Sequence, residues 1–238
     1  MKTKNPTLGA LALKPTLAVA ALALLIATSL AQAAGRNPNP GVIPPGSTYR
    51  GLTYGEWGAT FWTKLFAIPV VEGSHPYLTG GAFEGDKGVV FLTASGNGAT
   101  FEITIKAGTP ILTPILNAEC SVLEPDPFHG DSEAELRACA NGHMDTTSGL
   151  FASIDGVPVA NLGDYRVESP LFEFTLPEDN LFAFFGLDAP GGTTSPAVDA
   201  GVYLLLAPLS VGKHTLHIEG SFDVMGITFD NTFHITVE

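Results

Sequence analysis

The stretch 213-KHTLHIEGSFDVMGITFDNTFHITVE-238 decides the fold class of this chain. Its apolar residues fall on even positions up to Val224 and on odd positions from Ile227 onward. Strict alternation of this kind is typical of a strand that buries one face and exposes the other. Because the phase changes once, at Met225-Gly226, we expect a long two-stranded hairpin that turns at that point.

The solvent-facing side of this hairpin carries a candidate metal site. A symmetric turn at residues 225–226 pairs His217 with His234 and leaves Glu219 one step along the same face. Directly opposed residues have Cβ atoms about 5 Å apart. Two imidazoles and a carboxylate at that spacing can share a divalent metal ion. The simpler alternative is two ordinary surface histidines with no third ligand beside them.

The rest of the chain has the sequence pattern of a β protein. Residues 88–94 form a short apolar run, and residues 101–106 and 172–176 alternate between apolar and polar. Residues 202–206 are continuously apolar, which is typical of a strand covered on both faces. Many short strands separated by Gly and Pro clusters predict a mainly β fold, an antiparallel β-sandwich or a jelly-roll-like domain.

An amphipathic helix is expected before the strands begin. Thr53 and Glu56 have the spacing of a capping box, and aromatic and aliphatic residues follow every three or four positions until Pro69. Trp57 and Trp62 lie on this apolar stripe. A stripe this wide favours packing against a sheet. The alternative is an exposed aromatic platform that binds carbohydrate.

The two cysteines, Cys120 and Cys139, predict a disulfide, since an isolated pair in an oxidising compartment is most simply bonded. Cys139 lies in an expected short helix over residues 132–140, so the bond would tie this helix to the preceding strand. The segment around and between the cysteines is acidic, with Glu119, Glu124, Asp126, Asp131, Glu133 and Glu135. It is either a calcium-binding loop or, more simply, a solvated one.

The N-terminal residues 1–33 have the form of a signal peptide, with basic residues, an apolar run and an Ala31-Gln32-Ala33 cleavage site. The apolar run of about 14 residues is shorter than the roughly 20 needed to span a bilayer. A flexible Pro-rich leader is expected over 34–50 and a single β domain over 51–238. We therefore expect a secreted or periplasmic protein with no membrane span after the signal is removed.

The charge of the chain limits its partners. The formal net charge is −13, and removal of three signal lysines makes it more negative. A surface this acidic repels phosphate backbones and anionic lipids, so nucleic acid is not an expected partner.

Four stretches carry a resemblance to other proteins. They are GLTYGEWGATFWTKLFAIP (51–69), PILNAEC (114–120), EAELRACA (133–140) and APLSVGKHTLHIEG (207–220). Together they resemble an uncharacterised family of secreted bacterial proteins. The resemblance implies secretion and a shared architecture, and it implies no catalytic residue.

Catalytic motifs are absent from the sequence. It contains no G-x-S-x-G, no H-E-x-x-H and no phosphate-binding or dinucleotide-binding glycine loop. We therefore expect a non-catalytic binding or structural module that meets an extracellular ligand or protein. Two alternatives remain open. One is a metal-dependent enzyme that uses the His217–His234 pair, and the other is a carbohydrate-binding protein that uses Trp57 and Trp62.

Overall fold

The structure is a computed structural model that describes residue 1, residue 37, residue 39 and residues 41–238. Apart from Met1, the predicted signal peptide lies outside the described residues. A compact unit extends from Asn39 to Glu238.

This unit contains two β-sheets and several short helices. The strands of the first sheet are β1 (Gly81–Glu84), β2 (Val90–Thr93), β4 (Ile111–Ser121), β7 (Arg166–Glu168), β8 (Phe172–Thr175) and β9 (Thr194–Leu206). Those of the second are β3 (Thr100–Ile105), β5 (Thr147–Ile154), β6 (Val157–Pro158), β10 (Gly212–Phe222) and β11 (Ile227–Val237). The helices are α2 (Tyr54–Phe66), α3 (Pro76–Thr79), α4 (Glu133–Met144), α5 (Leu181–Phe184) and the 3-10 turn η1 (Leu162–Tyr165).

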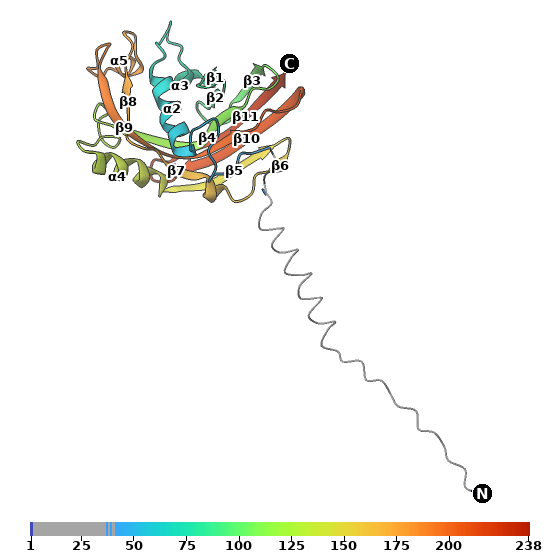
Figure 1. Ribbon diagram of the computed structural model, residues 1–238. Helices are drawn as coiled ribbons and strands as arrows, with labels where there is room; N and C mark the ends of the chain where they lie inside the picture. Colours follow the sequence, from blue (N-terminus) through green and yellow to red (C-terminus); the bar gives the residue numbers. More distant parts are fainter. Residues whose placement is uncertain (2–36, 38, 40) are drawn as a thin grey trace. The chain divides into compact units, whose positions relative to one another are not determined.

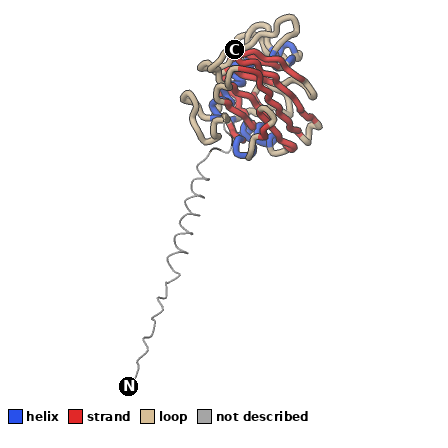
Figure 2. Tube along the Cα trace, turned by 90° about the vertical axis from the view of Figure 1, so that its right-hand side faces the viewer, coloured by secondary structure: helices blue, strands red, loops and turns tan. Residues whose placement is uncertain are grey.

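The predicted mainly β fold is confirmed. The first sheet has the order β1-β2-β4-β9-β7, with β8 also paired to β9, and the second has the order β3-β11-β10-β5-β6. Figure 2 shows the strands running side by side through the unit, with helices at its margins. Two pairs, β2 with β4 and β3 with β11, are parallel, so both sheets are mixed although most pairs are antiparallel.

The central strands β4 and β9 are covered on both faces. On one face, Gly58 of α2 lies so close to β9 that an added Cβ would be 2.5 Å from Asp199 Oδ2. On the other face, a Cβ added to Gly220 of β10 would be 2.7 Å from Leu116 Cδ1 of β4. Helix α2 and the second sheet therefore enclose the first sheet between them, with α2 packed mainly on β9 and β8 (Figure 1). Burial on both faces explains why β9 is almost continuously apolar.

Helix α2 begins where the sequence predicts. Thr53 and Glu56 form the expected capping box. Trp57 and Trp62 are only 0% and 7% exposed, because the apolar stripe packs against the first sheet. Their indole faces are therefore not available to a sugar, and the exposed platform that carbohydrate binding would need is not present at these two residues.

The predicted disulfide is also confirmed. Cys120 of β4 is bonded to Cys139 of α4. Ser132 accepts a hydrogen bond from the backbone N–H of Glu135 and caps α4, as its spacing predicts. The bond fixes α4 to the face of the first sheet opposite α2, because side chains along β4 alternate between faces.

Part of the segment predicted as a leader lies in the same compact unit as the β strands. From Asn39 onward, the segment expected to be a flexible leader packs on the domain. Ile43 N donates a hydrogen bond to Leu205 O at 2.8 Å, and Val42 is 2% exposed. The physical reason is that this apolar pair adds a short extended stretch to the end of β9, where Val42 bridges Leu206.

The predicted C-terminal hairpin is formed by β10 and β11, but the predicted register is wrong by two residues. Phe222 pairs with Ile227, His217 with Thr232 and His234 with Thr215. The turn occupies four residues, 223–226, so Val224 is 80% exposed instead of buried. A shift of two residues keeps every strand side chain on its own face, so the alternation alone does not reveal it.

Candidate metal centre and a buried carboxyl cluster

The solvent-facing side of the second sheet brings together His217, Glu219 and Asp230, which we call the outer cluster. His217 and Glu219 are two residues apart on β10, so they share a face, and Asp230 of β11 lies directly opposite Glu219. His217 Nε2 is 2.8 Å from Asp230 Oδ1 and 3.4 Å from Glu219 Oε1. One ligand atom from each residue lies within 4.8 Å of the other two.

These distances suit ligands of a single small cation. Two ligand atoms about 2.1 Å from one ion, at tetrahedral or octahedral angles, lie about 3.0–3.4 Å from each other. The three side chains are 29%, 41% and 59% exposed, so water has access to the remaining coordination positions. The Phe151 ring meets the His217 imidazole edge-on at 5.6 Å and limits its rotation. One nitrogen and two oxygens are an ordinary donor set for Zn²⁺ or Mn²⁺.

The outer cluster overlaps only in part with the predicted ligands. His217 and Glu219 come together, whereas His234 lies on β11 opposite Thr215 and beside Glu102 of β3. Sequence reasoning missed Asp230. Even-numbered residues of β11 face solvent, and Asp230 is one of them. The alternation along the strand was therefore a signal that could have identified Asp230.

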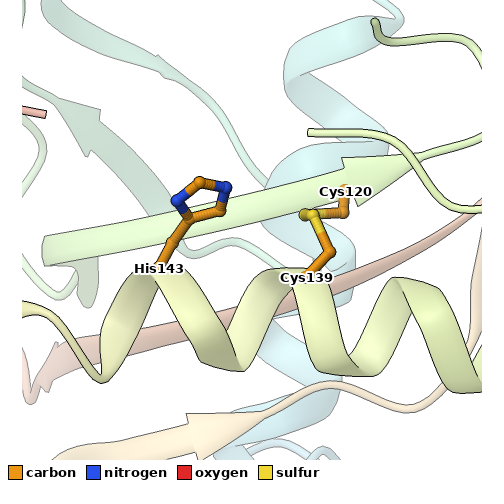
Figure 3. A group of neighbouring side chains, drawn as sticks. All are labelled: Cys120, Cys139 and His143. Atoms are coloured by element: carbon orange, nitrogen blue, oxygen red, sulfur yellow. A yellow bond between two sulfur atoms is a disulfide. The ribbon is translucent and has the colours of Figure 1, made fainter. Parts of the chain in front are cut away.

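A second grouping contains the disulfide and His143 (Figure 3). The two sulfurs are bonded to each other, so neither is a thiolate that could hold a metal. His143 Nε2 donates to Pro127 O at 2.9 Å, and its ring stacks on Phe128 with centroids 4.5 Å apart. These contacts give the grouping a structural role.

Three acids lie in or next to the first sheet: Glu119, Glu124 and Asp199, which we call the inner cluster. Glu119 and Glu124 belong to the acidic segment that the sequence offered as a calcium loop, whereas sequence reasoning did not single out Asp199. Glu119 of β4 and Asp199 of β9 are directly opposed and are 5% and 0% exposed. Glu124, just after β4, reaches back to hydrogen-bond the Glu119 side chain. The Ser121 hydroxyl donates to Glu124 Oε2. The available signal was an acid within each of two otherwise apolar strands.

Asp199 is fully engaged by donors. Its Oδ1 accepts from Trp62 Nε1 at 2.8 Å, and its Oδ2 accepts from the Tyr203 hydroxyl at 2.8 Å. Asn117 Nδ2 in turn donates to the Tyr203 oxygen. Burial raises the pKa of Asp199 to about 7, against the two hydrogen bonds, which act to lower it.

Glu119, unlike Asp199, has a carboxylate oxygen that accepts no hydrogen bond. Its Oε1 is the only buried side-chain nitrogen or oxygen without a hydrogen-bond partner among the described residues. Burial, and then the charge of Glu124, raise the pKa of Glu119 well above its usual range. Burial likewise raises the pKa of Glu124 to about 7. The inner cluster is therefore a buried set of like charges that cannot all be ionised without compensation.

The loop considered for calcium does not gather its acids around one point. Glu124 turns inward to Glu119, while Asp131 lies 3.1 Å from the His129 imidazole. Within residues 41–238, no three ligand atoms of the acids between the cysteines lie close enough to form a metal-sized group.

Comparison with known proteins identifies no family. No family description matches this chain, and no curated protein matches it. One solved structure, described as "Structure of PbICP-C in complex with falcipain-2", matches at a TM-score of 0.23 with 10% identity. The match covers 63% of this chain and 98% of that chain. At this TM-score the likeness carries no argument about fold or function.

Proposed function

We propose that this chain is an exported, non-catalytic binding module that holds a divalent metal ion on the outer face of its second sheet. The observation that carries the proposal is the convergence of His217, Glu219 and Asp230 at distances that suit ligands of one ion. Rigid neighbouring strands hold all three residues. The metal is then a docking point for an extracellular ligand or protein that supplies the remaining ligands.

Export is supported by two observations. The N-terminal sequence has the form of a signal peptide. The Cys120–Cys139 disulfide is of the kind that persists in oxidising compartments. Separately, none of the described helices is long and apolar enough to cross a membrane. The signal peptide and the disulfide favour the periplasm or the medium as the place where the protein acts.

A binding role fits the outer cluster better than hydrolysis because the cluster lies on an open sheet face. A depression of about 330 Å³ lies elsewhere, between residues 45–55 and 167–170. Its only lining carboxylate, Glu168, is bound to Arg137. Enzyme sites are generally concave and enclose most of the substrate. The outer cluster, with side chains 29–59% exposed, therefore favours docking of a partner over enclosure of a substrate.

Zinc titration by calorimetry tests this proposal on the exported protein, purified without a metal-binding tag. We expect one Zn²⁺ site in the wild type and at least tenfold weaker binding in His217→Ala and Asp230→Asn. His234→Ala is the matched control, because it removes a histidine from the same face without touching the cluster. Equal loss in His234→Ala, or no Zn²⁺ binding by the wild type, would contradict the assignment.

A further inference from the structure

The inner cluster contains a buried acceptor that the fold does not satisfy. Glu119 is 95% buried by residue area, at 5% exposure, and its Oε1 accepts no hydrogen bond from any described residue. Buried polar atoms in native proteins are nearly always paired with protein, water or an ion. An unpaired carboxylate oxygen at this depth therefore indicates a group that binds there.

The acidic neighbours of Glu119 supply negative charge, and the one basic group that acts on them in the part of the chain that the structure describes is His129, whose ring nitrogen contacts the Glu124 backbone oxygen at 2.9 Å. Asp199 stands opposite on β9 and Glu124 contacts the Glu119 side chain. Among the described residues, no Lys, Arg or His forms an ion pair with any of the three. Buried charges are ordinarily paired or coordinate a metal. A cation is the chemical species that this arrangement lacks.

The atoms that could coordinate a cation here are all oxygens, and they differ in how far hydrogen bonds already occupy them. Both oxygens of Asp199 are occupied by Trp62 and Tyr203, so Asp199 contributes charge and not coordination. Glu119 and Glu124 have carboxylates that face each other. Ser121 Oγ lies beside Glu124 and is held by the backbone N–H of Leu123 at 3.2 Å. Two carboxylates and a hydroxyl are donors that suit a hard cation.

We propose that the inner cluster is a second, hard-cation site, in which Glu119 and Glu124 coordinate a divalent ion of the Ca²⁺ type with Ser121 as a supporting oxygen. This inference goes beyond the proposed function, because the outer cluster contains an imidazole and suits a different class of metal. The ion satisfies Glu119 Oε1 and balances the two carboxylates. Without it, the two glutamates share a proton across their hydrogen bond.

Tyr77 of α3 connects this site to the surface. Its hydroxyl is near enough to Glu119 and Glu124 for their charges, after burial, to raise the pKa of the phenol. The residue as a whole is 44% exposed, and its ring lies 6.2 Å from that of Phe185.

Calcium binding measured by calorimetry on the exported protein tests the site. We expect one Ca²⁺ site in the wild type, at least tenfold weaker in Glu119→Gln and in Glu124→Gln. Glu219→Gln, from the outer cluster, is the matched control and keeps Ca²⁺ binding within twofold of wild type. For Zn²⁺ the two kinds of variant exchange roles: Glu219→Gln should weaken Zn²⁺ binding, and Glu119→Gln should leave it unchanged. Failure of one site can therefore be distinguished from failure of the other.

Folding of each variant is checked by its thermal midpoint and tryptophan fluorescence. Should Glu119→Gln fail to fold, the less buried Glu124→Gln decides the question alone. Three results would overturn the proposal: no Ca²⁺ binding by the wild type at millimolar concentration, unchanged binding in folded Glu119→Gln and Glu124→Gln, or loss of binding only in Asp126→Asn or Asp131→Asn. The last result would assign the ion to the loop.

Discussion

The outer and inner clusters are built on the same local geometry and behave as different chemical objects. In each, two carboxylates are directly opposed on neighbouring antiparallel strands, Glu219 with Asp230 and Glu119 with Asp199. The outer pair faces water and has an imidazole beside it. The inner pair lies under α2 and is reached by an indole, a phenol and a third acid. Surroundings, and not the residue types, decide which pair can stay ionised.

Removing the inner or the outer aspartate gives the largest expected contrast. Asp199→Ala leaves the Trp62 N–H and the Tyr203 hydroxyl buried without an acceptor, and each such group costs about 1–3 kcal/mol. We expect the free energy of unfolding to fall by about 4 kcal/mol in Asp199→Ala and by about 0.5 kcal/mol or less in Asp230→Ala. Urea denaturation measures both. Similar losses in the two variants would show that burial does not separate the clusters.

The disulfide is expected to matter for the inner cluster and not for the outer one. It closes a sequence separation of 19 residues that includes Glu124, so its removal frees the segment that holds Glu124 against Glu119. In the chain-entropy picture a loop of this size contributes about 3 kcal/mol. Cys120→Ala/Cys139→Ala should lose about that much stability by denaturation. Zn²⁺ binding should persist in the folded variant, and its loss would mean that the clusters are coupled.

The dependence of stability on pH is the finest test of the comparison. Burial raises the pKa of Asp199 from 3.8 to about 7, and that of Glu124 from 4.5 to about 7. Between these values the unfolded chain has lost protons that the folded chain keeps, so rising pH favours unfolding. We expect the free energy of unfolding to fall by about 2 kcal/mol for each of these two groups between pH 5 and pH 7.5, measured with a chelator present.

Two variants identify the source of that slope. Asp199→Asn removes one titrating group from the inner cluster and should flatten the curve. Asp230→Asn removes an acid from the outer cluster and should leave the curve parallel to that of the wild type. A wild-type stability that rises steadily from pH 5 to pH 7.5 would mean that the buried acids are ionised in the folded protein.

The sequence predicted those features that depend on a local pattern. The capping box at Thr53 and the alternation in the last two strands follow from spacing, and the Cys120–Cys139 bond follows from an isolated cysteine pair in an expected oxidising compartment. The structure contains all three. The register of β10 against β11 did not follow, because period-two alternation is unchanged by a shift of two residues. The length of the turn at residues 223–226 sets that register, and Asp230 therefore replaced His234 beside His217.

The inner cluster could not be predicted for a different reason. Glu119 and Asp199 are 80 residues apart in sequence and meet only because β4 pairs with β9. An acid inside an apolar run is unusual for a buried strand and can be noticed in the sequence. Which acid lies opposite it depends on the topology of the sheet.

The position of β11 has a consequence for the time course of biosynthesis. Among the described residues, strand β3 has β11 as its only neighbour in the second sheet, and roughly 120 residues of chain separate the two strands. At a synthesis rate of about 5–20 residues per second, β3 waits on the order of 6–24 s for its partner to be made. During that interval its hydrogen-bonding groups have no place in the sheet, and an unpaired strand is prone to pair with other chains. Strand β3 can therefore join its sheet only after the C-terminal strand is available.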